Sequence, residues 1–113
     1  MGCIFCDIAA GKAPSAAVYQ DADFVAFRDI KPVTPVHILI VPRQHIASLN
    51  EVTGEHSSLV GSMILVATHI ARQEKLDHGG YRLVMNCGRQ GGQAVPHLHV
   101  HLLGGRQLTP GMG

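Results

Sequence analysis

The chain of 113 residues is long enough for one domain with a hydrophobic core, and 46% hydrophobic residues is a globular rather than a disordered composition. We therefore expect residues 1–113 to form a single domain. The formal net charge of +1, with acidic and basic residues mixed along the chain, argues against nucleic acid or a membrane surface as a partner.

The sequence also predicts where the protein works. No apolar run approaches the roughly 20 residues of a membrane span. The first residues lack the basic and apolar regions of a secretory signal. Three cysteines without such a signal are typical of a reducing compartment, so we expect a cytoplasmic protein.

Short strands dominate the predicted first half of the chain. The expected elements are a helical turn at 5–10 and strands at 17–20, 23–29 and 36–41. In the second strand, the side-chain period of two places Val25, Phe27 and Asp29 on one face. The third strand, "VHILIV", is rich in β-branched residues and lies between two prolines, which is typical of a buried strand.

One long helix, expected over 53–76, separates these strands from two more. Its apolar stripe, which belongs to the core or to a subunit interface, is formed by Leu59, Met63, Val66 and Ile70. Strands are expected at 81–87 and 97–103, on both sides of a glycine-rich loop at 88–96. This order of elements predicts an α+β fold with a mostly antiparallel sheet.

The last expected strand, "HLHVHLL", carries three histidines at alternate positions. Because a strand has a side-chain period of two, His97, His99 and His101 project from one face and the aliphatic residues between them from the other. A solvent-exposed strand, a metal site and a catalytic site would each explain the histidine face. Catalysis is favoured, since three rings on one flat strand rarely converge on one metal.

The histidine strand and the loop before it suit phosphoryl-transfer chemistry. A neutral imidazole is a good nucleophile toward phosphorus once an acceptor holds its other nitrogen. Phosphoryl transfer also needs hydrogen-bond donors around the phosphoryl oxygens. The segment "GRQGGQ" can supply backbone N–H groups in a glycine nest. The residues by themselves therefore favour a phosphate site at the histidines.

The other cysteines and histidines allow less specific interpretations. Cys3-x-x-Cys6 is ambiguous among a redox pair, half of a zinc site and a coincidence. A redox pair usually follows a strand, which this position does not provide. Cys87 is expected to be a small core residue. Three more histidines lie in or beside the long helix, and we expect them at the surface or at the rim of a subunit interface: His56, His69 and His78.

Three long segments resemble the histidine triad superfamily. They are "CIFCDI", "DFVAFRDIKPVTPVHILIVPRQHI" and "YRLVMNCGRQGGQAVPHLHVHLLGGRQL", which together cover nearly the whole chain. Within the last segment, "HLHVHLL" matches the signature His-x-His-x-His-x-x with apolar x. Among the branches of the superfamily, the chain is most similar to the small nucleotide-binding proteins of the purine nucleoside phosphoramidase branch.

This resemblance implies a fold and an activity. The fold would be a five-stranded antiparallel sheet with one long and one short helix, which pairs in a homodimer into a ten-stranded sheet. The activity would be hydrolysis of purine nucleoside phosphoramidates or other AMP conjugates through a covalent nucleotidyl-histidine. His99 would attack phosphorus while the backbone carbonyl of His97 fixes its tautomer. His101 would contact the phosphate and help the leaving group, and His37 would support the array.

The resemblance also implies a nucleotide site. Asp29 would bind the ribose hydroxyls. Asn86, Gly92 and Gln93 would line the phosphate side, next to Ala94. The apolar slot for the base would be formed by Ile4, Phe5, Ile8, Phe27, Ile30 and Leu39.

A structural zinc ion is implied as well, since several members of the superfamily with this N-terminal cysteine pair bind one. Cys3 and Cys6 would be joined by His45 of "VPRQH" and by His97. Two thiolates and two imidazoles make a tetrahedral Cys2His2 set. The first histidine of the triad would then be structural and the other two catalytic. A reduced dithiol and a disulfide are the alternatives, and the chemistry itself needs no cofactor.

Two departures from the family pattern bear on the activity. The phosphoramidase branch commonly has Ser where this chain has Ala94, so one hydroxyl donor to the phosphate or the departing amine is absent. The C-terminal segment "RQLTPGMG" lacks the tryptophan that some members have. The alternatives are a dinucleoside polyphosphate hydrolase, a branch that usually has Gln where His101 stands, and a non-catalytic purine-nucleotide-binding scaffold dimer.

Overall fold

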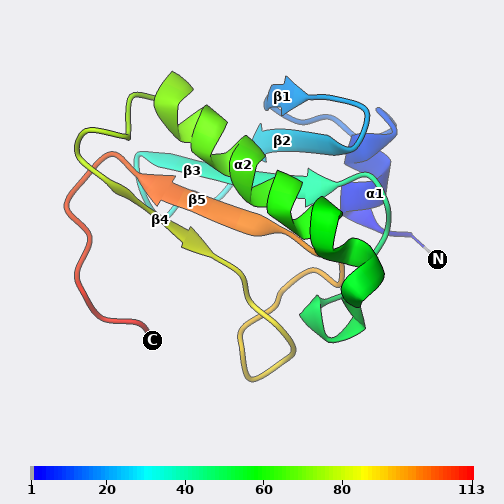
Figure 1. Ribbon diagram of the computed structural model, residues 1–113. Helices are drawn as coiled ribbons and strands as arrows, with labels where there is room; N and C mark the ends of the chain where they lie inside the picture. Colours follow the sequence, from blue (N-terminus) through cyan, green and yellow to red (C-terminus); the bar gives the residue numbers. More distant parts are fainter. Residues whose placement is uncertain (1) are drawn as a thin grey trace.

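A five-stranded antiparallel sheet forms the centre of the protein. The structure, a computed structural model, describes residues 2–113. The strand order is β1-β2-β3-β5-β4 (Figure 1). The strands are β1 Ala17–Gln20, β2 Phe24–Arg28, β3 Val36–Pro42, β4 Tyr81–Val84 and β5 Val100–Gly104. The predicted α+β fold with an antiparallel sheet is confirmed.

Two α-helices accompany the sheet, as predicted. They are the short α1, Ile4–Ala9, and the long α2, Ser57–Gln73; two 3-10 turns, η1 Leu49–Glu51 and η2 Gly54–His56, precede α2. Among the described residues, no helix is both long and apolar enough to cross a membrane. The cytoplasmic location stays a prediction.

The predicted start and end of the long helix are wrong by several residues. At the start, His56 Nδ1 accepts a hydrogen bond from the backbone N–H of Thr53 at 2.9 Å. The hydroxyl of Thr53 in turn accepts a hydrogen bond from Glu55 N–H. These two hydrogen bonds close a 3-10 turn before α2 begins. At the end, the left-handed backbone of Lys75, with φ of 60°, reverses the chain ahead of the expected glycines.

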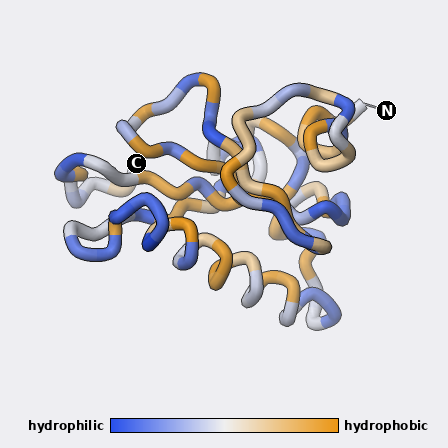
Figure 2. Tube along the Cα trace, turned by 90° about the horizontal axis from the view of Figure 1, so that it is seen from above, coloured by the Kyte–Doolittle hydropathy of each residue, from blue (hydrophilic) through white to orange (hydrophobic). Residues whose placement is uncertain are grey.

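The core between α2 and the sheet follows the predicted helical stripe. α2 lies across one face of the sheet (Figure 1), and apolar segments recur along it in Figure 2. Met63, Val66 and Ile70 are buried in this core, and Leu59 packs against it. The aliphatic residues of the histidine segment belong to the same core: Leu98, Val100 and Leu102.

A smaller apolar cluster lies on the opposite face of the sheet, beside α1. Strand alternation explains the division, because Phe24 and Ala26 of β2 belong to the α2 core while the residues between and after them face the other way. The members of this α1 cluster are Phe5, Val25, Phe27, Leu39 and Val41. Each face of the sheet therefore has its own apolar layer.

Both strands expected near the C-terminus are shorter than predicted. β4 ends at Val84, so residues 85–87 belong to the loop, and β5 begins only at Val100. The reason is that the segment before β5 bonds elsewhere: His97 N–H donates to Val95 O at 2.8 Å and Leu98 N–H donates to Ile46 O at 2.7 Å. The alternation of the histidines and aliphatic residues continues through this irregular segment.

Candidate functional site

His99 has one ring nitrogen fixed and the other free of protein partners. Its Nδ1 lies 2.6 Å from the backbone oxygen of His97. Because a carbonyl oxygen only accepts, Nδ1 carries the proton and donates it. In the neutral ring Nε2 is therefore a lone pair, with no hydrogen-bond partner among residues 2–113, although the residue as a whole is buried. This arrangement is the one expected for a nucleophilic imidazole.

His101 and His37 form a second, connected pair. His101 Nδ1 lies 2.9 Å from His37 Nε2, which in turn lies 3.4 Å from Asp29 Oδ2. The strand register explains the contact, because Leu39 of β3 faces His101 of β5 and His37 is the diagonal neighbour on the same side of the sheet. The rings of His99 and His101 are 4.9 Å apart at their centroids.

Burial keeps both members of this pair uncharged. Burial lowers the pKa of His37, against the opposing effect of the Asp29 carboxylate. Burial also lowers the pKa of His101, to about 4, and the neighbouring rings of His99 and His37 add to the effect. Near neutral pH the pair is therefore two neutral imidazoles.

The apolar cluster beside α1 borders the histidines through Phe5. The Phe5 ring packs edge-on against His99 and His97, with centroid distances of 5.1 Å and 5.9 Å. Three residues predicted for the base slot lie in this cluster: Phe5, Phe27 and Leu39. A fourth, Ile8, packs against it. Ile4 and Ile30 lie outside the cluster and are 50% and 92% exposed. Their contact with a nucleotide stays a prediction.

The glycine-rich loop is braced by its own polar side chains. Gln93 Nε2 donates to Ala47 O at 2.7 Å and to Val95 O at 3.0 Å, while its Oε1 accepts from Gly88 N–H at 3.0 Å. Asn86 Nδ2 donates to the backbone of the same loop at 2.8 Å. These two residues, predicted to line the phosphate side, therefore shape the loop backbone. Gly92, with φ of 80°, and the exposed Ala94 both lie within this loop.

The four residues predicted to bind zinc come together from three separate segments. His97 Nδ1 lies 3.3 Å from Cys3 Sγ, 3.5 Å from Cys6 Sγ and 3.2 Å from His45 Nδ1. Cys6 Sγ and His45 Nδ1 are 3.3 Å apart. One donor atom from each of the four residues lies within 4.8 Å of all the others. The cysteines come from the start of α1 and its cap, and the histidines from the loops that follow β3 and precede β5.

This donor set fits a tetrahedral zinc ion. Ligands about 2.0 Å (nitrogen) or 2.3 Å (sulfur) from zinc lie about 3.3–3.8 Å from one another, close to the observed separations. His97 Nε2 donates to Pro42 O at 2.8 Å, so its Nδ1 is left as a lone pair toward the cluster, as zinc-binding histidines require. Both thiols are free, which excludes the disulfide alternative in this structure.

Sequence reasoning missed two features of the site. The backbone N–H of Val33 donates to His37 Nδ1 at 3.1 Å, and no residue pattern signals this loop contact. Val25 and Val41 belong to the apolar cluster of Phe5. Their place could have been found, because strand alternation already puts Val25 beside Phe27 on one face.

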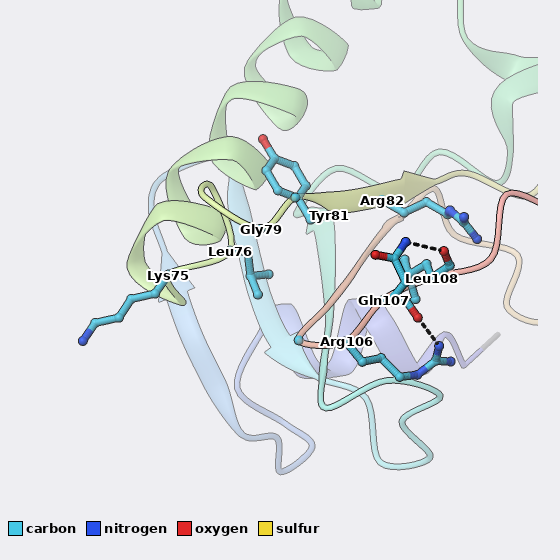
Figure 3. Close-up of a pocket in the computed structure, with 10 residues that line it drawn as sticks. Lys75, Leu76, Gly79, Tyr81, Arg82, Arg106, Gln107 and Leu108 are labelled. Carbon is cyan, nitrogen blue, oxygen red and sulfur yellow. Dashed lines mark hydrogen bonds between the residues drawn. The ribbon is translucent and has the colours of Figure 1, made fainter.

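Two surface cavities lie apart from the histidines. One, of about 490 Å³, is lined by the turn after α2, the start of β4 and residues 105–108 (Figure 3). The Lys75 side chain points away from residues 105–108. Arg82 of β4 donates to the backbone oxygen of Thr109, and Arg106 donates to that of its neighbour Gln107. The other, of about 420 Å³, is lined by the glycine-rich loop, including Gly92 and Gln93, which were predicted to line the phosphate side. Neither is lined by a predicted catalytic residue.

Comparison with known proteins agrees with the histidine arrangement. A family model for the HIT domain matches residues 10–108. The chain belongs to the HIT (histidine triad) family. This membership confirms the resemblance on which the predicted fold rests, and the roles of the individual HIT histidines stay predictions.

Relatives in the HIT family match over nearly the whole chain. A purine nucleoside phosphoramidase of Escherichia coli is 52% identical over 107 residues, which are 95% of this chain and 90% of that protein. A HIT family hydrolase from Legionella pneumophila has a TM-score of 0.95 and 47% identity over 96% of this chain and 97% of that one. A zinc-bound histidine triad family protein from Mycobacterium smegmatis has a TM-score of 0.83 and 34% identity, over 94% and 76% of the two chains.

Proposed function

We propose that this HIT protein hydrolyses purine nucleoside phosphoramidates and related AMP conjugates through a covalent nucleotidyl-histidine at His99. The observation that carries the proposal is the free Nε2 of His99, whose opposite nitrogen donates to the His97 carbonyl at 2.6 Å. The name of the relative from Escherichia coli, a purine nucleoside phosphoramidase, supports the same substrate class.

The proposed reaction has two displacements at phosphorus. In the first, the Nε2 lone pair of His99 attacks the α-phosphorus, and the phosphorus–nitrogen bond breaks with its electron pair passing to nitrogen, which takes up a proton and leaves as the amine. The ring keeps its Nδ1 proton, so the adduct is cationic, and the carbonyl oxygen of His97 stabilises it. In the second, water attacks phosphorus and gives up a proton, which replaces the one taken by the amine, while His99 leaves as a neutral imidazole and AMP is released.

The nucleotide would be held on three sides. The apolar cluster of Phe5, Phe27 and Leu39 would receive the purine, since an apolar slot with few polar groups suits a base. Asp29, whose carboxylate is partly exposed, would accept hydrogen bonds from the ribose hydroxyls. The N–H groups of Gly92 and Gln93 already donate within the loop, so the backbone N–H of Ala94, directly after them, would contact the phosphate.

We also propose a structural zinc ion and a homodimer. Cys3, Cys6, His45 and His97 would hold the ion, supported by their donor separations and by the zinc-bound relative. When bound, the ion would supply a rigid crosslink between the segments that carry these residues, without a direct part in the reaction. A dimer with a ten-stranded sheet would pair one of the two edge strands, β1 or β4, with its copy.

Substitution of His99 tests the function. The matched variants are His99→Ala and His78→Gln, because His78 is exposed and outside the site. We expect intact-mass spectrometry of the wild type with an adenosine phosphoramidate to show one added nucleotidyl group, and His99→Ala to lose both this adduct and turnover. His78→Gln should behave as the wild type. Turnover that survives in His99→Ala would refute the assignment of the nucleophile.

The same assay separates the alternatives. A dinucleoside polyphosphate hydrolase would cleave a dinucleoside polyphosphate faster than the phosphoramidate. A non-catalytic scaffold, for which the missing hydroxyl at Ala94 is the supporting feature, would bind AMP tightly and form no adduct. We expect instead faster turnover of the phosphoramidate, together with the adduct.

A further inference from the structure

One short segment of the chain belongs both to the Cys2His2 cluster and to the predicted nucleotide site. Cys3 and Cys6 are members of the cluster, and Phe5, which lies between them, is a predicted base-slot residue. We propose that the two sites are energetically coupled through residues 3–6, so that zinc and a purine nucleotide each strengthen the binding of the other. The inference rests on the proposed function, from which it takes both ligands.

The ring of Phe5 contacts both sites. It packs edge-on against Phe27, another predicted base-slot residue, at a centroid distance of 5.5 Å. It packs in the same way against His97 of the cluster at 5.9 Å and against His99 at 5.1 Å. Because Phe5 is buried and closely packed, a shift of its backbone would change all three of these contacts together.

Few contacts other than those of the cysteines hold this segment on the rest of the protein. α1 has only six residues, and a helix of this length is unstable by itself. Within the described chain, hydrogen bonds of residues 2–8 reach beyond residue 13 only through the two cysteines, whose partners are the cluster histidines. The other anchors of α1 are its apolar packing and one hydrogen bond from Arg43 to Ala9 O at the end of the helix. The order of residues 3–6 therefore depends strongly on the cluster.

His97 provides a surface against which Phe5 packs. Its Nε2 donates to Pro42 O at 2.8 Å, while its Nδ1 faces the two sulfur atoms. A zinc ion at Nδ1 would therefore hold the imidazole at both of its nitrogens. Phe5 would then be fixed twice, by the ligands on either side of it in the sequence and by the ring of His97.

A shared segment of this kind couples two ligands through its conformational entropy. The ligand that binds first must order residues 3–6, which weakens its apparent affinity. The second ligand meets a segment that is already ordered and binds more tightly. Thermodynamic linkage requires that zinc strengthen nucleotide binding by the same factor by which the nucleotide strengthens zinc binding.

Reciprocal titrations of the wild type test the coupling. Zinc affinity is measured against a competing chelator with and without saturating AMP, and AMP affinity is measured by calorimetry on zinc-loaded and on chelator-treated protein. The chelator sets the free zinc concentration, so the binding of zinc to AMP itself does not contribute. We expect each ligand to strengthen the other by about 10-fold, within the usual range for two coupled sites.

Two variants of the base slot separate the coupled segment from the slot itself. Phe5 and Leu39 both belong to the α1 cluster, but only Phe5 lies between the cysteines. Phe5→Ala keeps all four zinc ligands and should lose most of the coupling, so that zinc hardly changes AMP affinity. Leu39→Ala is the matched control. It should weaken AMP binding equally in the zinc-loaded and chelator-treated protein and keep the wild-type coupling factor.

Amide hydrogen exchange shows the ordering of the segment directly. Treatment of the wild type with a chelator should speed exchange in α1, residues 4–9, and leave the central strand β3 protected. Saturating AMP should restore part of the protection of α1 in the chelator-treated protein. An α1 that exchanges at the same rate with and without zinc would contradict the proposal without any use of a nucleotide.

The outcomes distinguish this inference from the proposed function. AMP affinity that is the same with and without zinc in the wild type would refute the coupling, whether or not the variants fold, and would leave the proposed hydrolysis intact. Absence of AMP binding in both forms would refute the proposed nucleotide site and the coupling with it. The full wild-type factor in Phe5→Ala would refute transmission through residues 3–6.

Discussion

At the residue scale, backbone groups fix the tautomers of three histidines in the site. The His97 carbonyl fixes His99, the Pro42 carbonyl fixes His97 and the Val33 N–H fixes His37. Backbone partners satisfy the ring nitrogens of these buried histidines without adding charge. The free lone pairs consequently point to different tasks: that of His97 toward the cysteines and that of His99 toward the open site.

Gln93 is the residue whose side chain does most to hold the glycine-rich loop. We expect Gln93→Ala to lower the free energy of unfolding by about 1–2 kcal/mol, because three hydrogen bonds are lost, two of them to half-buried carbonyl oxygens. The looser loop should also weaken nucleotide binding. Urea denaturation and AMP titration would measure both effects. Gln90→Ala, at an exposed position of the same loop, is the control, and equal effects of the two would contradict the bracing role.

At the scale of elements, the position of β5 depends on its packing under the end of α2. β5 pairs with β3 on one side and with β4 on the other, which places His101 beside His37. At its end, Gly104 lies directly under the buried Leu76, which follows α2. A Cβ atom at Gly104 would come within 2.8 Å of a Leu76 methyl carbon, so a side chain there would push the two elements apart.

We expect Gly104→Ala to destabilise the protein by about 1–3 kcal/mol, the usual cost of an added methyl group in a packed core. Gly79→Ala is the matched control, since a Cβ atom there meets nothing within 4 Å, and its effect should stay within about 0.5 kcal/mol. Thermal and urea unfolding would measure both. An unchanged stability of Gly104→Ala would mean that Leu76 moves aside freely.

At the scale of the whole molecule, the Cys2His2 cluster ties the two ends of the chain together. Cys3 and Cys6 approach His97 across 94 and 91 positions of sequence. The same N-terminal segment carries Phe5, which packs on His99. A bound ion would therefore hold α1, the loop after β3 and the histidine segment in one rigid unit.

Removal of the metal should lower the stability of the molecule. We expect elemental analysis to find one zinc ion per chain. Zinc at 100 times its dissociation constant should stabilise the fold by about 2.7 kcal/mol relative to protein treated with a chelator. Cys6→Ser should lose this zinc-dependent shift in Tm, whereas Cys87→Ser should keep it, because Cys87 lies outside the cluster. A wild type without zinc and with the same Tm in chelator would contradict the site.

Local patterns in the sequence determined the elements and their faces. The period of two in "HLHVHLL" placed the histidines opposite Leu98 and Val100, and the helical stripe predicted the buried face of α2. The resemblance to the family over the wider sequence implied the four zinc ligands and His37. These features depend on residues that are neighbours along the chain or on a motif that can be read directly.

Only the tertiary structure decided how these residues meet. The bond from Leu98 to Ile46 joins two remote loops, and the bond from Val33 to His37 depends on the shape of the turn before β3. Neither has a periodic pattern, so the sequence did not predict where β5 begins or which nitrogen of His37 is protonated. Hydrogen bonding between remote loops depends on how the two faces of the sheet pack. The sequence thus determined which side chains face the site, and packing decided their protonation and their partners.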